Sequence, residues 1–451
     1  MKSGAHGRNP RASPANIRSQ NRRAIAERAA NRKAGRAGGT IAAAPLYNGN
    51  RARRGFAGAA RQAMRILFYL PVVTPFWFET LLLPMLAALH DHAELHVLAP
   101  AEWQHTGIGA RELAMAAHLD RIRWHIVGDG DHGSLRTRPS DPEGLIAFVR
   151  DLAPDHVLCR SAEDATPKRF PGRVQYIMET GASPLRSDVW LRLQDGIFEH
   201  GVMPALEPGI AQRLDALFAP RWQAAVTRCR SEGAFALDRA AACAAMGLPD
   251  DRRIVAVPLE YAHPENFFDI HHRFPDNCAL IDHLVAQLPP GWVLAATDHP
   301  LNEAYCDTTA LRACIDRHQG RVRLVSGEDA TGLMVKHCDA LVVQNSKTFA
   351  AGAFFAKPIL RLSHCRSADW LNLFDDAPSL FAAVERGDAP VADPDRFRLW
   401  VAYHLLDEAF LPATLTGADL IGRMTQPVDP ARWADALDRY DAFQPRSLHH
   451  A

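Results

Sequence analysis

The stretch Met64-Arg65-Ile66-Leu67-Phe68-Tyr69-Leu70 predicts the first strand of an α/β domain, because it is a short apolar run rich in strand-forming residues. From there the sequence alternates short β-rich runs with longer amphipathic segments. Strands are expected at 66–70, 94–98, 122–126, 156–158 and 174–178, and helices at 83–90, 110–118, 142–152 and 207–217. Alternation of this kind indicates a parallel sheet covered by helices.

A second series of the same type follows an Ala-rich helical stretch at 221–246, which Gly247 should end as a C-cap. Its strands are expected at 253–258, 292–296, 322–325, 340–343 and within 357–362, and its helices at 277–287, 308–318, 330–337 and 349–356. Two doubly wound halves in series predict an α/β fold with two Rossmann-like domains that face a cleft. We expect a tail at 1–62, domains at 63–250 and 251–390, and helices at 391–451 that pack across both.

The net charge of zero hides an asymmetry between the first 62 residues and the rest of the chain. Residues 1–62 contain fourteen Lys and Arg but one acid, Glu27, so they carry about +13 and the remainder about −13. An acidic body argues against nucleic acid as a partner. The segment is too poor in aromatic and β-branched residues to fold, which predicts a disordered basic tail.

Three interpretations of this tail stay open. It is an arm that contacts anionic membrane surfaces, a transit-type peptide, or sequence upstream of a true start at Met64, which we favour slightly. The eight cysteines form no CxxC pair, so we expect reduced thiols, no metal and no cofactor. With no apolar signal segment and no membrane span visible, the prediction is a cytoplasmic protein, with peripheral contact to the inner membrane if the tail binds it.

Two short motifs follow predicted strands of the second half, where parallel sheets bind ligands. His299-Pro300 comes after the strand at 292–296, and a histidine there can donate a hydrogen bond to a phosphate oxygen. Asn345-Ser346-Lys347-Thr348 comes after the strand at 340–343, and offers hydroxyls and backbone N–H groups to an anion. The alternatives are a loop histidine beside a turn-forming proline and ordinary helix N-capping.

A third motif, Glu179-Thr180-Gly181, follows the strand at 174–178 in the first half. A carboxylate at the end of an apolar strand is placed for general-base catalysis, and partial burial is expected to raise its pKa. The alternative is a carboxylate that only caps a turn.

Other motifs are weaker. Residues 128–133 spell G-x-G-x-x-G and, through Asp129 and Asp131, D-x-D, but the polar, proline-containing sequence that follows favours a surface loop. No GxxxxGK[ST] motif occurs, which argues against a P-loop NTPase.

The order of these motifs from Val255 to Leu362 resembles the capsule polysaccharide biosynthesis family, whose members include Kdo transferases of the GT-B fold. The quoted residues are Pro258-Leu259, His299-Pro300, Cys338 to Val343, Asn345-Ser346 and Lys357-Pro358, with Glu179-x-Gly181, Arg186 and Asp195 to Phe198 in the first half. The resemblance implies a GT-B-like fold with an acceptor domain first and a nucleotide-sugar domain second. It implies that His299, Ser346 and Thr348 hold the phosphate and base of a CMP-sugar, supported by Pro300 and Asn345. It also implies that Arg186 and Glu260 contact substrate.

The chain departs from the family pattern at two of these positions. Thr180 replaces a second carboxylate, so if that carboxylate is the family's base, either Glu179 serves instead or activity is lost. Glu260 stands where the family usually has Gln. The prediction is a glycosyltransferase that moves a sugar, Kdo or sialic acid, from a nucleotide donor to a capsular or other surface polysaccharide or glycolipid. The alternatives are a non-catalytic paralogue that binds glycan or nucleotide, and a polyol-phosphate transferase or nucleotide-sugar epimerase on the same fold.

Overall fold

The structure is a computed structural model that describes residues 64–103, 106–128, 139–181, 190–263, 266, 268–327 and 329–442. The predicted tail at 1–62 lies outside these residues, as do Arg186 and the pair Asp129 and Asp131. None of the helices within the described ranges has both the length and the apolar character needed to cross a membrane.

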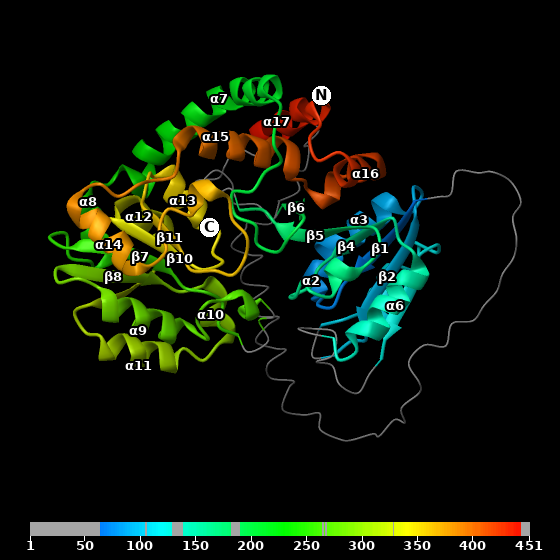
Figure 1. Ribbon diagram of the computed structural model, residues 1–451, viewed down its shortest axis with the longest axis horizontal. Helices are drawn as coiled ribbons and strands as arrows, with labels where there is room; N and C mark the ends of the chain where they lie inside the picture. The colour runs from blue at the N-terminus through cyan, green and yellow to red at the C-terminus, as the bar shows by residue number, and fades with distance from the viewer. Residues whose placement is uncertain are drawn as a thin grey trace, which may run out of the picture. The chain divides into compact units, whose positions relative to one another are not determined.

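The first sheet has six strands in the order β3-β2-β1-β4-β5-β6 (Figure 1). All neighbouring strands are parallel except β5 and β6. The strands are β1 (Arg65–Tyr69), β2 (Glu94–Pro100), β3 (Arg123–Val127), β4 (His156–Cys159), β5 (Arg173–Glu179) and β6 (Leu191–Gln194). Because the chain runs outward from β1 to β3 and then crosses over to β4, the strand order is that of a Rossmann-like sheet.

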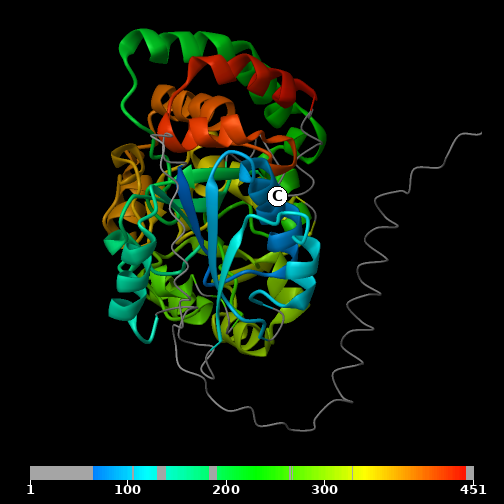
Figure 2. The ribbon, with the colours of Figure 1, turned by 90° about the vertical axis from the view of Figure 1, so that its right-hand side faces the viewer.

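Side chains of the first sheet alternate between two apolar cores, as the period of two in a strand requires. Ile66 and Phe68 of β1 lie in one core, while Leu67 and Tyr69 lie in the other. Figure 2 shows the first strands of this sheet in blue and cyan, with helices beside them. The helices of this half are α2 (Pro75–Trp77), the π-helix η1 (Phe78–Leu82), α3 (Leu83–Leu89), α4 (Ala110–Met115) and α6 (Pro142–Leu152).

The second sheet has five parallel strands in the order β11-β10-β7-β8-β9. They are β7 (Arg253–Pro258), β8 (Trp292–Thr297), β9 (Val322–Val325), β10 (Ala340–Val343) and β11 (Ile359–Arg361). Val255 and Val257 belong to one core, and Ile254 and Ala256 to the opposite one, so helices cover both faces. The helices are α7 (Pro208–Ser231), α8 (Arg239–Met246), α9 (Asn277–Gln287), α10 (Pro300–Tyr305), α11 (Thr309–Arg317), α12 (Ala330–His337), α13 (Phe349–Phe354) and α14 (Ala377–Arg386).

The C-terminal segment contributes to the cores of both sheets. Its helices are α15 (Pro394–Tyr403), the π-helix η6 (His404–Glu408), α16 (Gly417–Thr425) and α17 (Trp433–Ala442). Trp400 and Trp433 lie in a core of the second sheet, whereas Leu420 and Met424 lie in a core of the first. In Figure 1, α15 runs beside α7, with which it packs.

One local prediction was wrong, and one strand was not predicted. The sequence suggested that one helix stops at 217 and a second runs from 221 to 246, but α7 continues through Pro220 and the chain then breaks before α8. The antiparallel strand β6 was not predicted, because Leu191–Gln194 is short and carries two polar residues. Gly247 does end α8 in the left-handed conformation, with φ 65°, which confirms the predicted C-cap.

The predicted fold class is confirmed. Each sheet starts in its centre, runs to one edge and crosses back, so the chain has two Rossmann-like α/β halves. Helices α7 and α8, which precede β7 in sequence, bury Phe218 and Cys243 in a core of the second sheet. The boundary proposed at 250 between the two domains stays a prediction.

Candidate functional site

Residues from the carboxyl ends of both sheets meet at one ion pair. Glu179 is the last residue of β5, and Lys347 lies in the loop between β10 and α13. The Lys347 Nζ donates to Glu179 Oε2 over 3.0 Å. We use the name strand-end site for this pair and the residues that surround it: Trp77, Arg160, Gly181, Glu260, His299, Asn345, Ser346 and Thr348.

The surroundings of Glu179 lower the pKa of its carboxyl group instead of raising it. The Lys347 ammonium lowers the pKa of Glu179 to about 2. Arg160 and a hydrogen bond from Trp77 act in the same direction, whereas desolvation opposes them. The prediction that partial burial raises this pKa was therefore wrong, since two nearby cations outweigh desolvation. The Glu179 side chain keeps 39% of its surface exposed, so a ligand can still reach it.

Arg160 and Trp77 were not identified from the sequence. Arg160 directly follows β4, and its buried guanidinium lies 3.2 Å from the centre of the Trp77 ring. Trp77 belongs to α2, which follows β1, and Thr74 caps this short helix by accepting from the Trp77 N–H. The available signal was position, because Arg160 follows β4, the neighbour of β5, and Trp77 follows β1, the next strand along the sheet.

Gly181 permits the close approach of Lys347. A Cβ at this position would lie 2.8 Å from the Lys347 Cγ and 2.9 Å from its Cβ, closer than real contacts allow. The Gly181 N–H donates to the His404 Nε2 over 3.4 Å, and the His404 Nδ1 lies 2.5 Å from Glu408 Oε2. The lysine side chain of one sheet therefore lies directly against the backbone of the other.

His299 follows β8 as predicted and is the N-cap of α10. Its Nδ1 accepts from the Leu301 N–H at 3.2 Å, and Pro300 occupies the first turn of that helix. This capping role is the structural alternative to phosphate binding. It also determines the tautomer of His299, because an accepting Nδ1 leaves the proton on Nε2. Burial lowers the pKa of His299, and the charges of Lys347 and Glu179 both act on it. His299 is thus a neutral N–H donor beside the ion pair.

Glu260 organises the loop after β10. Its Oε1 accepts from the Asn345 N–H at 2.9 Å, and burial raises the pKa of Glu260 to about 7. The Ser346 hydroxyl donates to the Thr348 hydroxyl over 2.9 Å, and α13 begins only at Phe349. Asn345 is 4% exposed, and its Nδ2 has no hydrogen-bond partner among the residues that the structure describes.

The structure thus brings together most of the predicted site residues. Glu179, His299, Asn345, Ser346 and Thr348 lie at strand exits around Lys347, while Glu260 acts behind the loop as a hydrogen-bond acceptor. The donors are an ammonium, an imidazole N–H, two hydroxyls and an amide, which suit an oxyanion such as a phosphate. A carboxylate that can accept a proton stands directly beside them.

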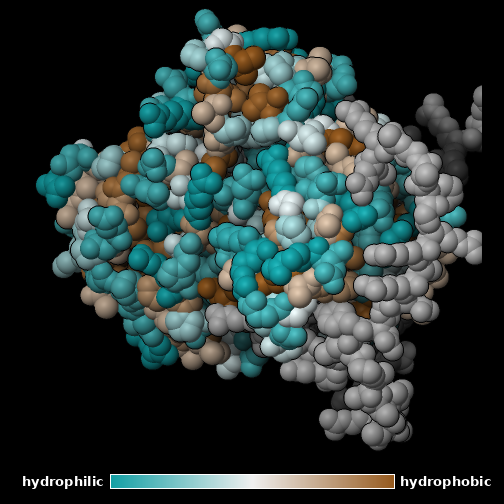
Figure 3. Space-filling view, turned by 45° about the vertical axis from the view of Figure 1, so that its right-hand side comes forward, coloured by the Kyte–Doolittle hydropathy of each residue, from teal (hydrophilic) through white to brown (hydrophobic). Residues whose placement is uncertain are grey.

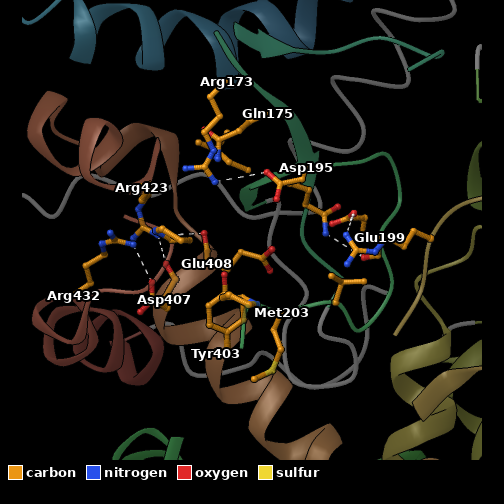
Figure 4. Close-up of a pocket in the computed structure, with 16 residues that line it drawn as sticks. Arg173, Gln175, Asp195, Glu199, Met203, Tyr403, Asp407, Glu408, Arg423 and Arg432 are labelled. Atoms are coloured by element: carbon orange, nitrogen blue, oxygen red, sulfur yellow. Dashed lines mark hydrogen bonds and ion pairs between the residues drawn. The ribbon is translucent and has the colours of Figure 1, made fainter. Parts of the chain in front are cut away.

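A separate cavity of about 180 Å³ lies between β5, β6 and the C-terminal segment (Figure 4). Its charges are largely paired within it, with Arg173 near Asp195, Arg366 on Glu199 and Arg432 on Asp407. The side-chain oxygens of Gln175 and Gln194 are buried there without a partner in the described part of the chain. Balanced ion pairs and free amide oxygens suit ordered water, and the cavity shares no residue with the strand-end site.

No protein-family model matches this sequence, and no curated protein matches it. Solved structures do align with it. The β-Kdo 2,7-transferase KpsC of Thermosulfurimonas dismutans is 11% identical over 74% of this chain and 99% of that one, with a TM-score of 0.38. The Anabaena protein HepE, solved with UDP-glucose, is 12% identical over 84% and 98%, with a TM-score of 0.26. The heptosyltransferase II of E. coli is 11% identical over 83% and 99%, with a TM-score of 0.22.

Proposed function

We propose that the strand-end site binds a nucleotide-sugar and transfers its sugar to a hydroxyl group of a glycan. The observation that carries this proposal is the Lys347–Glu179 ion pair, which joins an anion-binding group of one sheet to a carboxylate of the other. Glycosyl transfer from a nucleotide-sugar needs both groups, because the leaving group is a phosphate and the attacking hydroxyl must lose a proton.

The donor phosphate would bind to groups of the second sheet. The Lys347 ammonium and the His299 Nε2–H supply the two strongest hydrogen bonds, and the hydroxyls of Ser346 and Thr348 supply weaker ones. The Asn345 amide, buried without a partner in the described residues, is a further donor. These groups also stabilise the charge that develops on the phosphate as the glycosidic bond breaks.

Lys347 connects donor binding to base catalysis. A carboxylate with a pKa of about 2 is a weak base, so the observed ion pair is not the reactive state. A phosphate that engages Lys347 withdraws the charge that lowers the pKa of Glu179, and that pKa then rises towards its ordinary value. Glu179 can then take the proton of the acceptor hydroxyl. Donor binding would therefore prepare the base.

For the donor we propose a CMP-linked acidic sugar, Kdo or sialic acid, and for the acceptor a capsular or other surface polysaccharide. The support is the motif resemblance together with Arg160, whose guanidinium lies near Glu179 and would suit a sugar carboxylate. The proposal includes no metal in the reaction, because lysine and histidine supply the positive and hydrogen-bonding groups that the phosphate requires.

One observation favours a second function. With the pKa of Glu179 held at about 2, and with Thr180 in place of a second carboxylate, the chain also suits a non-catalytic protein that binds nucleotide or glycan. Such a protein would bind nucleotide with the same groups but would show no sugar transfer. Turnover therefore separates the two functions, whereas nucleotide binding tests the site that both share.

A thermal-shift experiment with CMP, UDP and GDP tests the nucleotide site. We expect CMP to raise the melting temperature of the wild-type protein. His299→Ala should weaken CMP binding by roughly 10- to 100-fold, the effect of losing a strong hydrogen bond. His283→Ala, which removes an exposed histidine of α9, is the matched control and should bind like wild type. A shift with UDP or GDP alone would contradict the CMP assignment, and no shift with any of the three would contradict the nucleotide site.

A further inference from the structure

Four residues with metal-ligating side chains lie on two adjacent helices of the second half. Cys278 and Asp282 are four positions apart on α9, and Cys314 and His318 are four positions apart at the end of α11. Residues four apart share one face of a helix, and α9 and α11 pack against each other (Figure 1). The same spacing on both helices therefore places two pairs of ligand-type side chains between them.

Three of these side chains already converge. One ligand atom from each of Asp282, Cys314 and His318 lies within 4.8 Å of the other two. The Cys314 Sγ is 3.6 Å from Asp282 Oδ1, and the His318 Nε2 is 2.6 Å from the same oxygen. Ligand atoms of a tetrahedral zinc ion lie roughly 3.3–3.8 Å apart, given bonds of about 2.0–2.3 Å. The sulfur–oxygen separation fits this geometry, and the nitrogen–oxygen separation needs to open by only about 0.7 Å.

Cys278 provides a second sulfur beside the three converging atoms. Its thiol and the Cys314 thiol are hydrogen-bonded to each other, and the Cys314 Sγ also lies 3.9 Å from the Cys278 carbonyl oxygen. The Cys278 Sγ itself points to the Ala310 carbonyl oxygen at 3.7 Å. A change of its side-chain rotamer is the step that would complete a four-ligand set.

An ordinary ion-pair cluster is the competing explanation. Arg317 lies 3.1 Å from Asp282 Oδ2, so Asp282 has a cation partner without any metal. That partner does not explain why Cys314, whose surface is fully buried, directs its thiol at the carboxylate. Arg317 also donates to Asp282 Oδ1 at 3.3 Å, so this oxygen faces the guanidinium as well as the sulfur and the imidazole, and a metal ion would compete with Arg317 for it.

We propose that Cys278, Asp282, Cys314 and His318 form a zinc site that joins α9 to α11. Thiolate, imidazole and carboxylate ligands favour Zn²⁺ over Mg²⁺ or Ca²⁺, which prefer oxygen ligands alone. A thiol binds Zn²⁺ as the thiolate, so binding of the ion at these cysteines would release protons. The site is structural, includes no residue of the strand-end site and is independent of the proposed function.

The experiment uses the full-length protein under reducing conditions, first treated with a chelator and then titrated with Zn²⁺ against a chromogenic chelator. We expect one tightly bound Zn²⁺ per chain, a higher melting temperature with Zn²⁺, and a thiolate charge-transfer absorption when Co²⁺ replaces it. Cys314→Ser and His318→Ala should each lower the Zn²⁺ affinity by at least about tenfold.

Matched controls localise the ion. Cys306→Ser removes a thiol from the end of α10, and His283→Ala removes a histidine next to Asp282. Both should bind Zn²⁺ like the wild type. Asp282→Asn, which preserves shape, should weaken binding and thereby separate loss of a ligand from loss of folding. The proposal is overturned if the reduced wild type binds no stoichiometric Zn²⁺, or if Cys314→Ser and His318→Ala bind it unchanged.

Discussion

The strand exits of the two sheets differ in what holds their polar groups. At the second sheet, Asn302 binds the Glu260 carbonyl and Asp298, and Glu260 binds the Asn345 N–H, so these loops are fixed within their own half. At the first sheet, Arg160 and Trp77 of the same half act on Glu179, but its ion-pair partner, Lys347, comes from the other half. Under the proposed function, this difference means that the side that would bind the nucleotide is built in advance, whereas the protonation state of the proposed base depends on where Lys347 binds.

The largest effect is expected from a substitution of Glu179 at the first sheet. Glu179→Gln keeps the shape of the side chain and removes its basicity, so turnover should fall by roughly 10²–10⁴. Steady-state kinetics with a nucleotide-sugar and a glycan acceptor measure it. Glu79→Gln, an exposed carboxylate on η1, is the control and should keep full turnover. Unchanged turnover in Glu179→Gln would place the base elsewhere.

A smaller effect is expected from removing the shared lysine. Lys347→Met should weaken nucleotide binding by roughly 10- to 100-fold, because one charge-assisted hydrogen bond is lost. It also removes the charge that lowers the pKa of Glu179 to about 2. Since that pKa should rise, the acid limb of the kcat/KM profile should move to higher pH. Lys168→Met, an exposed lysine paired with Asp164, should change neither quantity, and an unmoved acid limb in Lys347→Met would contradict the coupling.

Glu260→Gln tests whether the second-sheet loops are fixed in advance. Burial raises the pKa of Glu260 from 4.5 to about 7 in the folded state, so between these values the folded protein binds more protons than the unfolded one. The stability of the wild type must therefore fall as pH rises through this window. Glutamine keeps the acceptor for the Asn345 N–H without the charge, so the variant should be more stable than wild type at pH 8, by roughly 1–3 kcal/mol, and nearly equal at pH 5.

Denaturant unfolding at the two pH values measures this difference. Glu303→Gln, an exposed residue of α10, is the control and should show no comparable change between pH 5 and pH 8. A Glu260→Gln variant that is less stable than wild type at pH 8 would show that the ionised carboxylate supports the loop.

The smallest effect is expected from Gly181→Ala. The added Cβ would lie 2.8 Å from the Lys347 Cγ, so the lysine must shift and its contact with Glu179 must weaken. Partly exposed ion pairs contribute about 0.2–1 kcal/mol, so nucleotide affinity and turnover should change by no more than about fivefold. Calorimetry and kinetics on the same preparation measure both. Gly209→Ala, where a Cβ meets no neighbour within 4 Å, is the control, and a change as large as that of Lys347→Met would contradict a local displacement.

Much of the fold could be predicted because its strands and helices have strong local patterns. β7, β10, α9 and α12 were predicted to the residue, since each is an apolar or amphipathic run with clear ends. Pro220 was misread because α7 tolerates it inside a long helix, which packing against the second sheet supports. The π-helices η1 and η6 have no local pattern that distinguishes them from α-helix.

The candidate site could be predicted only in part. His299 and Glu179 each follow a predicted strand. Ligands bind at the carboxyl ends of parallel strands, so a site that includes both residues could be predicted. The sign of the pKa shift at Glu179 could not be predicted, because Lys347 is 168 positions away in sequence. Arg160 and Trp77 were missed for the same reason, since their role depends on contacts that form only in the folded chain.

The central claim is that a nucleotide phosphate and Glu179 compete for Lys347. Calorimetric titration of CMP into the wild-type protein and into Glu179→Gln tests it most directly, at one pH and one ionic strength because the contact is electrostatic. The account predicts that both proteins bind CMP and that Glu179→Gln binds it more tightly, by up to about fivefold, because the competing carboxylate charge is gone. Absence of CMP binding in the wild type, or binding to Glu179→Gln that is tenfold weaker, would contradict it.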